Sequence, residues 1–176
     1  MSFTFFVRLL FCVGIVGFST MVQAQGLSVE IFEGNIEEST SNNRILLVID
    51  GEKRTKFRLS DLEKITLYEI KMPPIWKGED GKYQGVLLKD IMALVGVTEA
   101  KTVRLVAIDG YVIDLEKKIW QSSCSFIATR HKKQEISIDK KGPTRLLLPC
   151  SVLMPDYEDT GTSDWIWNLK EIHIQK

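Results

Sequence analysis

The sequence predicts an α+β fold that is mostly β, with a mixed sheet and short helices. Short segments rich in apolar and β-branched residues recur along the chain, and Gly-containing dipeptides with turn character separate several of them. Only two stretches suggest a helix, and both are short. The 176 residues are enough for one domain with its own hydrophobic core.

Strands are expected wherever such segments end at a turn signal. Residues 44–50 form a strand before the turn at Asp50-Gly51, and residues 102–108 and 111–115 flank the hairpin signal Asp109-Gly110. A second hairpin is expected around residues 131–134. The remaining expected strands are 66–70, 125–130, 135–138, 144–148 and 165–174.

Both helices are predicted from local patterns. Ser60 and Glu63 have the spacing of a capping box, which predicts a short helix ending near residue 65. Apolar residues at helical spacing over 87–95 predict the second helix, and Gly96 is a typical helix stop. The two prolines and two glycines of residues 72–83 predict a long irregular connection between them.

The first segment has the pattern of an export signal. Arg8 precedes an apolar run, and Val22-Gln23-Ala24 offers a small-x-small cleavage site. We therefore expect residues 1–24 to be a signal peptide and residues 25–176 to be a single mature domain. The alternative is a retained membrane anchor, for which the apolar run is short.

Composition limits the classes of partner and site. The chain has 23 Lys+Arg and 23 Asp+Glu, so no excess of charge points to nucleic acid or an anionic membrane. Three cysteines and two histidines leave little material for a metal site. After leader cleavage only Cys124 and Cys150 remain. They are expected either to form a disulfide or to be two buried free thiols.

The aromatic residues near the C-terminus suggest a ligand site. Trp165 and Trp167 would share a face on a strand, and Asp164 precedes them. An aromatic wall beside a carboxylate suits a flat heterocycle with an amidine-like edge, such as guanine or a pterin. The alternative is a structural tryptophan pair.

Two further places offer weaker signals. Asp109 and Tyr111 are an acid and a phenol at a sheet end, or simply a hairpin turn. Arg130 is either an anion-binding residue or a solvated turn residue, and His131 is expected to be a solvated histidine in a polar turn. No nucleotide-binding, hydrolase or metalloprotease motif occurs, so the chain does not have the signature of an autonomous hydrolase.

Four segments taken together resemble a known family. They are YQGVLLKDIMALVG (83–96), VRLVAIDGYVIDL (103–115), KGPTRLLLP (141–149) and WIWNLKEIHI (165–174). In this order they resemble the molybdopterin-binding domain of the sulfite oxidase type, and more closely its small, standalone, exported members. The resemblance covers roughly residues 44–174 and implies a mixed α+β sheet fold with a pterin-sized cleft.

The resemblance also carries an expectation of function. Catalytic members ligate molybdenum with a cysteine thiolate upstream of the sheet, and no cysteine lies between Gln25 and Ser123. The expected role is therefore a non-catalytic periplasmic protein that requires no cofactor, binds a reduced pterin and signals to the periplasmic sensing domain of a membrane protein of cyclic-di-GMP metabolism. The alternatives are a molybdopterin-dependent oxidoreductase or its subunit, and a ligand-free interaction module. We expect seven residues to line the pterin site: Asp109, Tyr111, Arg130, Tyr157, Asp164, Trp165 and Trp167.

Overall fold

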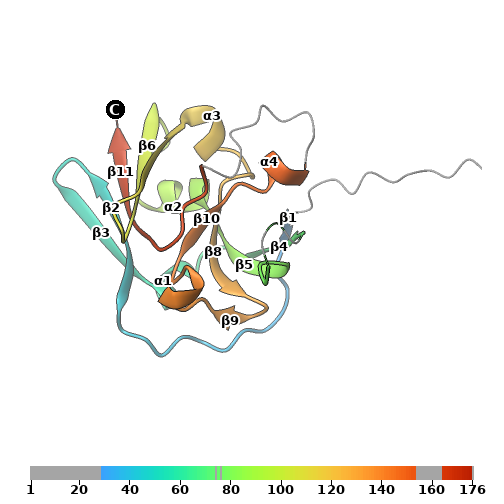
Figure 1. The fold of residues 1–176 in the computed structure, drawn as a ribbon. Coiled ribbons are helices and arrows are strands. Elements are labelled where there is room, and N and C mark those ends of the chain that lie inside the picture. The colour runs from blue at the N-terminus through green and yellow to red at the C-terminus, as the bar shows by residue number, and fades with distance from the viewer. Residues whose placement is uncertain (1–28, 74, 76, 154–163, 176) are drawn as a thin grey trace, which may run out of the picture.

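The fold is α+β and mostly β, as the sequence predicts. The computed structural model describes residues 29–73, 75, 77–153 and 164–175. In this part of the chain the strands form two sheets, with four short α-helices and one 3-10 helix around them (Figure 1). The predicted leader, residues 1–24, lies outside the described residues.

The first sheet is antiparallel throughout. Its order is β1-β4-β5-β8-β10, and β9 pairs with β8. Gly85 of β5 lies so close to β8 that a Cβ there would come within 2.1 Å of the Ile127 carbonyl oxygen, so no larger residue fits. The strands of this sheet are β1 (Val29–Ile31), β4 (Tyr68–Met72), β5 (Gly81–Leu87), β8 (Phe126–His131), β9 (Gln134–Glu135) and β10 (Arg145–Leu147).

The second sheet is mixed. Its order is β3-β2-β11-β6-β7, in which β11 runs parallel to β2 and antiparallel to β6. Its strands are β2 (Arg44–Asp50), β3 (Lys53–Arg58), β6 (Thr102–Ala107), β7 (Val112–Glu116) and β11 (Leu169–Gln175). Leu169 at the start of β11 donates its N–H to the carbonyl of Thr144, 2.8 Å away, which brings the two sheets together beside β10 (Figure 1).

One hydrophobic core joins the two sheets and the helices. The fully buried residues include Leu46 of β2, Leu105 of β6 and Phe126 of β8. The helices are α1 (Leu59–Leu62), α2 (Leu88–Leu94), α3 (Lys117–Trp120) and α4 (Cys150–Leu153), and the 3-10 helix is η1 (Ile138–Lys140). No helix in the described residues is both long and apolar enough to cross a membrane.

The second predicted helix and the β6–β7 hairpin are confirmed. Helix α2 buries Leu88, Ile91 and Met92, and Gly96 follows it at φ +84°, a conformation that glycine adopts without strain. Gly110 supplies the positive φ of the β6–β7 turn in the same way.

The predicted cap of the first helix is wrong. Helix α1 begins two residues earlier than a Ser60 cap allows, with Arg58 at the N-cap position, and Asp61 Oδ2 accepts the backbone N–H of Arg58, 2.9 Å away. Glu63 lies at the C-terminal end of this helix instead of inside its first turn. Its carboxylate is therefore available to another part of the chain, and it pairs with Arg130.

Several predicted strand boundaries are also wrong. The strand expected over residues 135–138 is reduced to β9 (Gln134–Glu135), and the 3-10 helix η1 begins at Ile138. The last strand begins at Leu169 rather than Trp165, because residues 165–168 make only one isolated bridge, between Ile166 and Leu146. Strand β4 begins at Tyr68, two residues later than expected. The turn of the β8–β9 hairpin consists of Lys132 and Lys133, both at positive φ, so His131 belongs to β8 and not to the turn.

Candidate functional site

The site begins with an arginine inside a buried strand. Arg145 is the first residue of β10, and its side chain is only 2% exposed. The other residues of β10, Leu146 and Leu147, belong to the hydrophobic core. A charged side chain in such a place must be paired, because burying an unpaired charge is costly.

Glu79 is the partner of Arg145. It lies in the connection between β4 and β5, and its Oε2 atom is 2.5 Å from Arg145 Nη1. Its Oε1 atom accepts from Lys141 Nζ at 2.8 Å, and the hydroxyl of Tyr83 donates to Oε2 at 3.0 Å. Burial alone would raise the pKa of Glu79, but the hydrogen bond from Lys141 and the charge of Arg145 outweigh it, so this pKa lies below its usual value.

Glu79 engages only one nitrogen of the Arg145 guanidinium. The Nε and Nη2 atoms are buried and have no hydrogen-bond partner. These two N–H groups point the same way from one side of the planar guanidinium, which we call its side-on edge. A side-on edge is suited to two neighbouring acceptor atoms. Each buried donor left without an acceptor costs about 1–3 kcal/mol, so the empty edge of Arg145 is an unusual feature.

Arg130 provides a direct comparison within the same chain. It is 3% exposed, and its side-on edge is filled by Glu63, with Nε 2.6 Å from Oε1 and Nη2 3.0 Å from Oε2. Nη2 also donates to the carbonyl of Glu37 at 2.7 Å, and Nη1 donates to the carbonyl of Lys133 at 3.2 Å. The two arginine side chains are equally buried, and of the two side-on edges only that of Arg145 lacks a hydrogen-bond partner.

Aromatic side chains surround the Arg145 cluster. The Tyr83 ring stacks on His131, with centroids 4.3 Å apart and planes 13° apart, and the Arg145 guanidinium carbon lies 5.4 Å from the Tyr83 centroid. Burial raises the pKa of the Tyr83 phenol despite the opposing charge of Arg145. Lys141 Nζ lies 3.8 Å from the centroid of Trp167, whose side chain is partly exposed.

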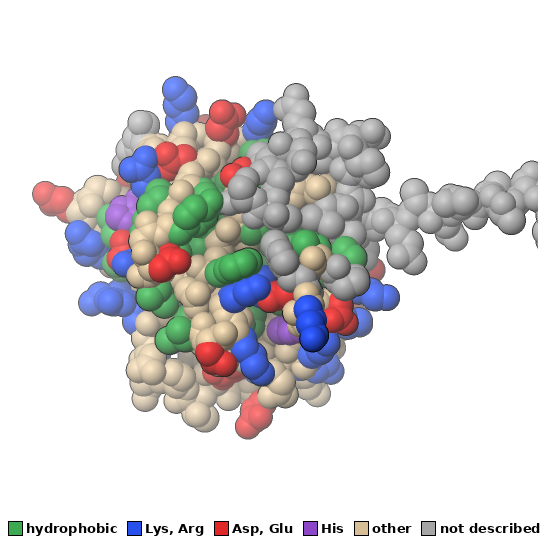
Figure 2. All heavy atoms as spheres, viewed as in Figure 1, with side chains coloured by type: hydrophobic (Ala, Val, Ile, Leu, Met, Phe, Trp, Pro, Cys, Tyr) green, Lys and Arg blue, Asp and Glu red, His purple; other side chains and the backbone are tan. Residues whose placement is uncertain are grey.

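The backbone places Trp167 beside Arg145. Leu146 and Ile166 form an antiparallel bridge, so Arg145 and Trp167 occupy the next facing position on the two segments. The cluster therefore combines a buried pair of N–H donors that lack a hydrogen-bond partner with an aromatic residue at the facing backbone position. We define the Arg145 site as Glu79, Tyr83, His131, Lys141, Arg145 and Trp167. Figure 2 shows hydrophobic, basic and acidic side chains interspersed over the described part of the face in view, without a broad field of one charge.

The seven residues expected to line the site do not all lie together. Trp167 is part of the Arg145 site. Trp165 is 5% exposed, and its indole N–H donates to Ser151 Oγ at 3.4 Å, so it does not share the exposure of Trp167 as a common strand face would require. Asp164 precedes Trp165 and is half-buried, while Tyr157 lies outside the described residues.

Asp109 and Tyr111 form the turn of the β6–β7 hairpin. Asp109 Oδ1 accepts the backbone N–H of Tyr111 at 3.0 Å, and the Tyr111 side chain is 47% exposed. The turn neighbours Trp167 in the fold, because Ile108 donates its N–H to the carbonyl of Asn168 at 2.9 Å. The turn interpretation therefore describes the observed backbone, and a role in ligand binding stays a prediction.

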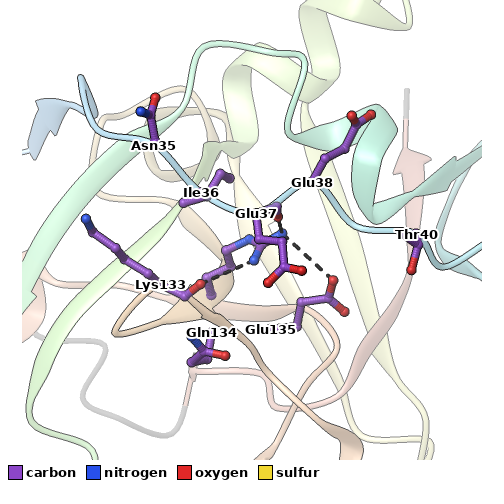
Figure 3. Close-up of a pocket in the computed structure, with 9 residues that line it drawn as sticks. Asn35, Ile36, Glu37, Glu38, Thr40, Lys133, Gln134 and Glu135 are labelled. Atoms are coloured by element: carbon purple, nitrogen blue, oxygen red, sulfur yellow. Dashed lines mark hydrogen bonds and ion pairs between the residues drawn. The ribbon is translucent and has the colours of Figure 1, made fainter.

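Arg130 is not a solvated turn residue, and that interpretation is wrong. It lies on β8, and a hollow of about 460 Å³ opens next to it (Figure 3). The anion that Arg130 holds is Glu63, so its donors are already used within the protein. The other residues that line this hollow are Asn35, Ile36, Glu37, Glu38, Thr40, Lys133, Gln134 and Glu135.

The two described cysteines form a disulfide. Cys124 and Cys150 have Cα atoms 5.5 Å apart and are both buried, so of the two alternatives left open by the sequence the structure shows the crosslink. It ties Cys124, two residues before the start of β8, to the start of α4, three residues after the end of β10. Neither cysteine in this part of the chain offers a thiolate to a metal, and the described residues contain no group of three His, Cys, Asp or Glu side chains arranged to hold a metal ion.

Comparison with known families and curated proteins identified no relative of this chain. No model of a protein family matches the chain, and no curated protein matches its sequence.

Sequence reasoning missed Glu79, Tyr83, Lys141 and Arg145 and took His131 for a solvated residue. The one signal that pointed to the site was Arg145 itself, a charged residue in a segment expected to be a short, apolar, buried strand. A buried arginine needs a partner, but sequence alone does not identify Glu79, which lies 66 residues earlier in an irregular connection.

Proposed function

We propose that the protein is a non-catalytic binding protein for a pterin or a closely related heterocycle. The observation that carries this proposal is the buried, unfilled side-on edge of Arg145. Two parallel N–H donors call for a ligand with two neighbouring acceptors, and a pterin has such a pair in its carbonyl O4 and ring nitrogen N5. Arginine also makes a two-point contact with the O6 and N7 atoms of guanine, which have a closely similar arrangement.

The surroundings of Arg145 fit a flat, partly polar ring. Trp167 offers an exposed aromatic surface at the facing backbone position, and Tyr83 and His131 add two stacked rings to the cluster. Filling both open donors with acceptors recovers part of the penalty for leaving them unsatisfied, because a hydrogen bond to a charged donor contributes roughly 1.5–3 kcal/mol. This gain is available only to a ligand with the right acceptor pair.

A molybdenum-cofactor oxidoreductase is supported less well. In the family that the sequence resembles, the metal is held by a cysteine thiolate, and here Cys124 and Cys150 are joined to each other. The described residues therefore lack the donor that this chemistry needs. We accordingly assign the Arg145 site to ligand recognition and derive no catalytic step from it.

The proposed setting is the periplasm. The leader-like residues 1–24 support export, and the resemblance to small exported members of the sulfite oxidase superfamily supports a role in relaying ligand state to a membrane protein of cyclic-di-GMP metabolism. The same resemblance supports a sulfite-oxidase-like arrangement of the two sheets. A ligand in contact with both Arg145 and Trp167 would order the surface around Lys141. The membrane protein would then recognise this ordered surface.

A titration tests the binding role. Mature protein is titrated with 6-hydroxymethyl-7,8-dihydropterin under anaerobic conditions, and heat and tryptophan fluorescence are recorded. We expect saturable one-to-one binding that Arg145→Lys weakens at least tenfold, because lysine is a point donor and lacks the planar donor pair. Arg104→Lys is the matched control, since Arg104 makes a two-point pair with Asp114 on the exposed face of β6. Absence of binding to the wild type would leave the ligand-free interaction module as the better description.

A further inference from the structure

A second hollow, which shares no residue with the Arg145 site, is mainly apolar. It has a volume of about 370 Å³ and is lined by segments of both sheets. Leu59 of α1 and Ile136, which follows β9, are buried in its lining, whereas Ile108 and Ile138 are 48% and 65% exposed. We call this hollow the Ile138 groove. An apolar hollow that continues into exposed isoleucines is typical of an interaction surface.

Asn168 holds the two exposed isoleucines in place. Its backbone has φ +50°, a left-handed conformation that asparagine adopts more readily than most residues. Its Nδ2 donates to the carbonyls of Ile138 and Gly142 at 2.8 and 2.6 Å, and its own carbonyl accepts the N–H of Ile108 at 2.9 Å. The groove is therefore formed before a partner arrives, which lowers the cost of binding.

The exposed apolar surface extends beyond the groove. Tyr111 and Val112 of the β6–β7 hairpin are exposed, and so is Trp167 next to Asn168. A pocket for a small molecule encloses most of the surface of its ligand, whereas a side chain as open as Ile138 encloses little. The extent of this surface therefore favours a protein as the partner.

The charges in the lining indicate which kind of protein segment fits. Arg44 and Lys170 both line the groove. Within the described part of the chain the exposed Arg44 side chain has no ion pair or hydrogen bond, and Lys170 has only a 4.0 Å contact with Glu171. The one acid in the lining, Glu135, lies 3.8 Å from Arg130 Nη2. The lining thus carries a net positive charge, which is complementary to carboxylates.

We propose that the Ile138 groove docks a segment of a partner protein in which an apolar side chain stands next to acidic residues. The apolar side chain fills the hollow beside Ile108 and Ile138, and the carboxylates pair with Arg44 and Lys170. This inference goes beyond the proposed function, because it assigns a protein-binding surface that needs no pterin. The groove still neighbours the Arg145 site, since the Asn168 N–H donates to the Lys141 carbonyl at 3.0 Å.

Selection from a peptide library tests the apolar part of the proposal. Random peptides displayed on phage are selected on the mature protein, and the affinity of an enriched peptide is measured by fluorescence polarisation. We expect enriched sequences to combine an apolar residue with Asp or Glu. Ile138→Glu should weaken binding at least about tenfold, because it puts a charge beside the apolar hollow. Leu94→Glu is the matched control, since Leu94 is 60% exposed at the end of α2 and lies outside the groove.

A charge exchange tests the polar part. Arg44→Glu should weaken binding of the acidic peptide about fivefold. The same variant should bind more tightly than the wild type to a peptide in which lysines replace the acids. Arg54→Glu, on the exposed part of β3 and outside the groove, should leave the wild-type order of affinities unchanged.

Every outcome supports the proposal or overturns it. Failure to enrich any peptide, enrichment of peptides without acidic residues, or unchanged affinity in Ile138→Glu overturns it. Displacement of the peptide by dodecanoate would assign the groove to an amphipathic small molecule instead, and a dimer that Ile138→Glu dissociates would assign it to a second copy of the chain. Because none of these measurements contains a pterin, their failure is distinct from failure of the proposed function.

Discussion

The two buried arginines predict opposite responses to the same substitution. We consider Arg130→Met and Arg145→Met, since methionine is unbranched, flexible and apolar and can fill much of the space of an arginine stem. The two arginine side chains are 3% and 2% exposed, so the apolar burial that methionine retains is comparable at the two positions. Only the polar partners of the two side chains differ.

Arg130→Met removes the partner of a buried carboxylate. Glu63 is 7% exposed and loses both hydrogen bonds from Arg130, and the carbonyls of Glu37 and Lys133 lose one donor each. Removing one member of a buried ion pair costs about 3–5 kcal/mol. We therefore expect Arg130→Met to lower the free energy of unfolding by about that amount.

Arg145→Met gives a different balance. Glu79 loses one hydrogen bond to a charged group, about 1.5–3 kcal/mol, but keeps its contacts with Lys141 and Tyr83. The substitution also removes two buried donors that had no partner, each of which costs about 1–3 kcal/mol. These ranges place the net effect between a destabilisation of at most about 1 kcal/mol and a net stabilisation, and we expect loss of ligand binding with it.

Urea unfolding with the disulfide intact measures both values. Tryptophan fluorescence reports the transition, and Arg104→Met controls for the loss of an exposed arginine and is expected to leave the midpoint nearly unchanged. The reasoning requires Arg130→Met to be less stable than Arg145→Met by at least about 2 kcal/mol. If the two variants lose equal stability without ligand, the side-on edge of Arg145 is satisfied in solution, and the argument for a ligand there fails.

Three further predictions follow from other parts of the molecule. Reducing the Cys124–Cys150 disulfide, which spans 26 residues, should lower the free energy of unfolding by about 3.5 kcal/mol in the chain-entropy model. Urea midpoints of the wild type and of the double variant Cys124→Ser/Cys150→Ser, each with and without dithiothreitol, measure this loss, and equal midpoints would show that the crosslink contributes nothing. The pKa of Glu79 lies below its ordinary 4.5 in the folded state, so the ionised carboxylate stabilises the fold above pH 4.5, and this stabilisation is lost as the pH falls through the folded pKa. Glu79→Gln should therefore have a lower free energy of unfolding than the wild type near neutral pH, but a smaller decrease on acidification; urea midpoints at several pH values measure this difference, and parallel curves would contradict it. Intact mass of protein isolated from the periplasm should correspond to residues 25–176 with one disulfide, whereas a mass that includes residues 1–24 would support a retained anchor.

The parts of the fold that sequence predicted well are those fixed by local chemistry. Helix α2 and the β6–β7 hairpin each have both a periodic apolar pattern and a glycine at positive φ, so residues close in sequence determine them. The first helix shows the limit of local reasoning. The Ser60/Glu63 pair and the Arg58/Asp61 pair each have the spacing of a capping box at the N-terminus of this helix. The structure uses Arg58 and Asp61, while Glu63 pairs with Arg130, 67 residues later in the chain.

The candidate site was hard to predict for a related reason. Sequence reasoning searched for ligand contacts among exposed residues with turn or strand signals, and it selected Arg130 while leaving Arg145 inside a buried strand. Both arginines are buried in the structure, and they differ only in their long-range partners: the side-on edge of Arg130 is paired with Glu63, whereas that of Arg145 has no hydrogen-bond partner. A glutamate opposite each side-on edge would have given two equivalent structural ion pairs. Since Glu79 instead meets Arg145 at a single nitrogen and divides its other contacts between Lys141 and Tyr83, the Nε–H and Nη2–H groups of Arg145 are left without a hydrogen-bond partner.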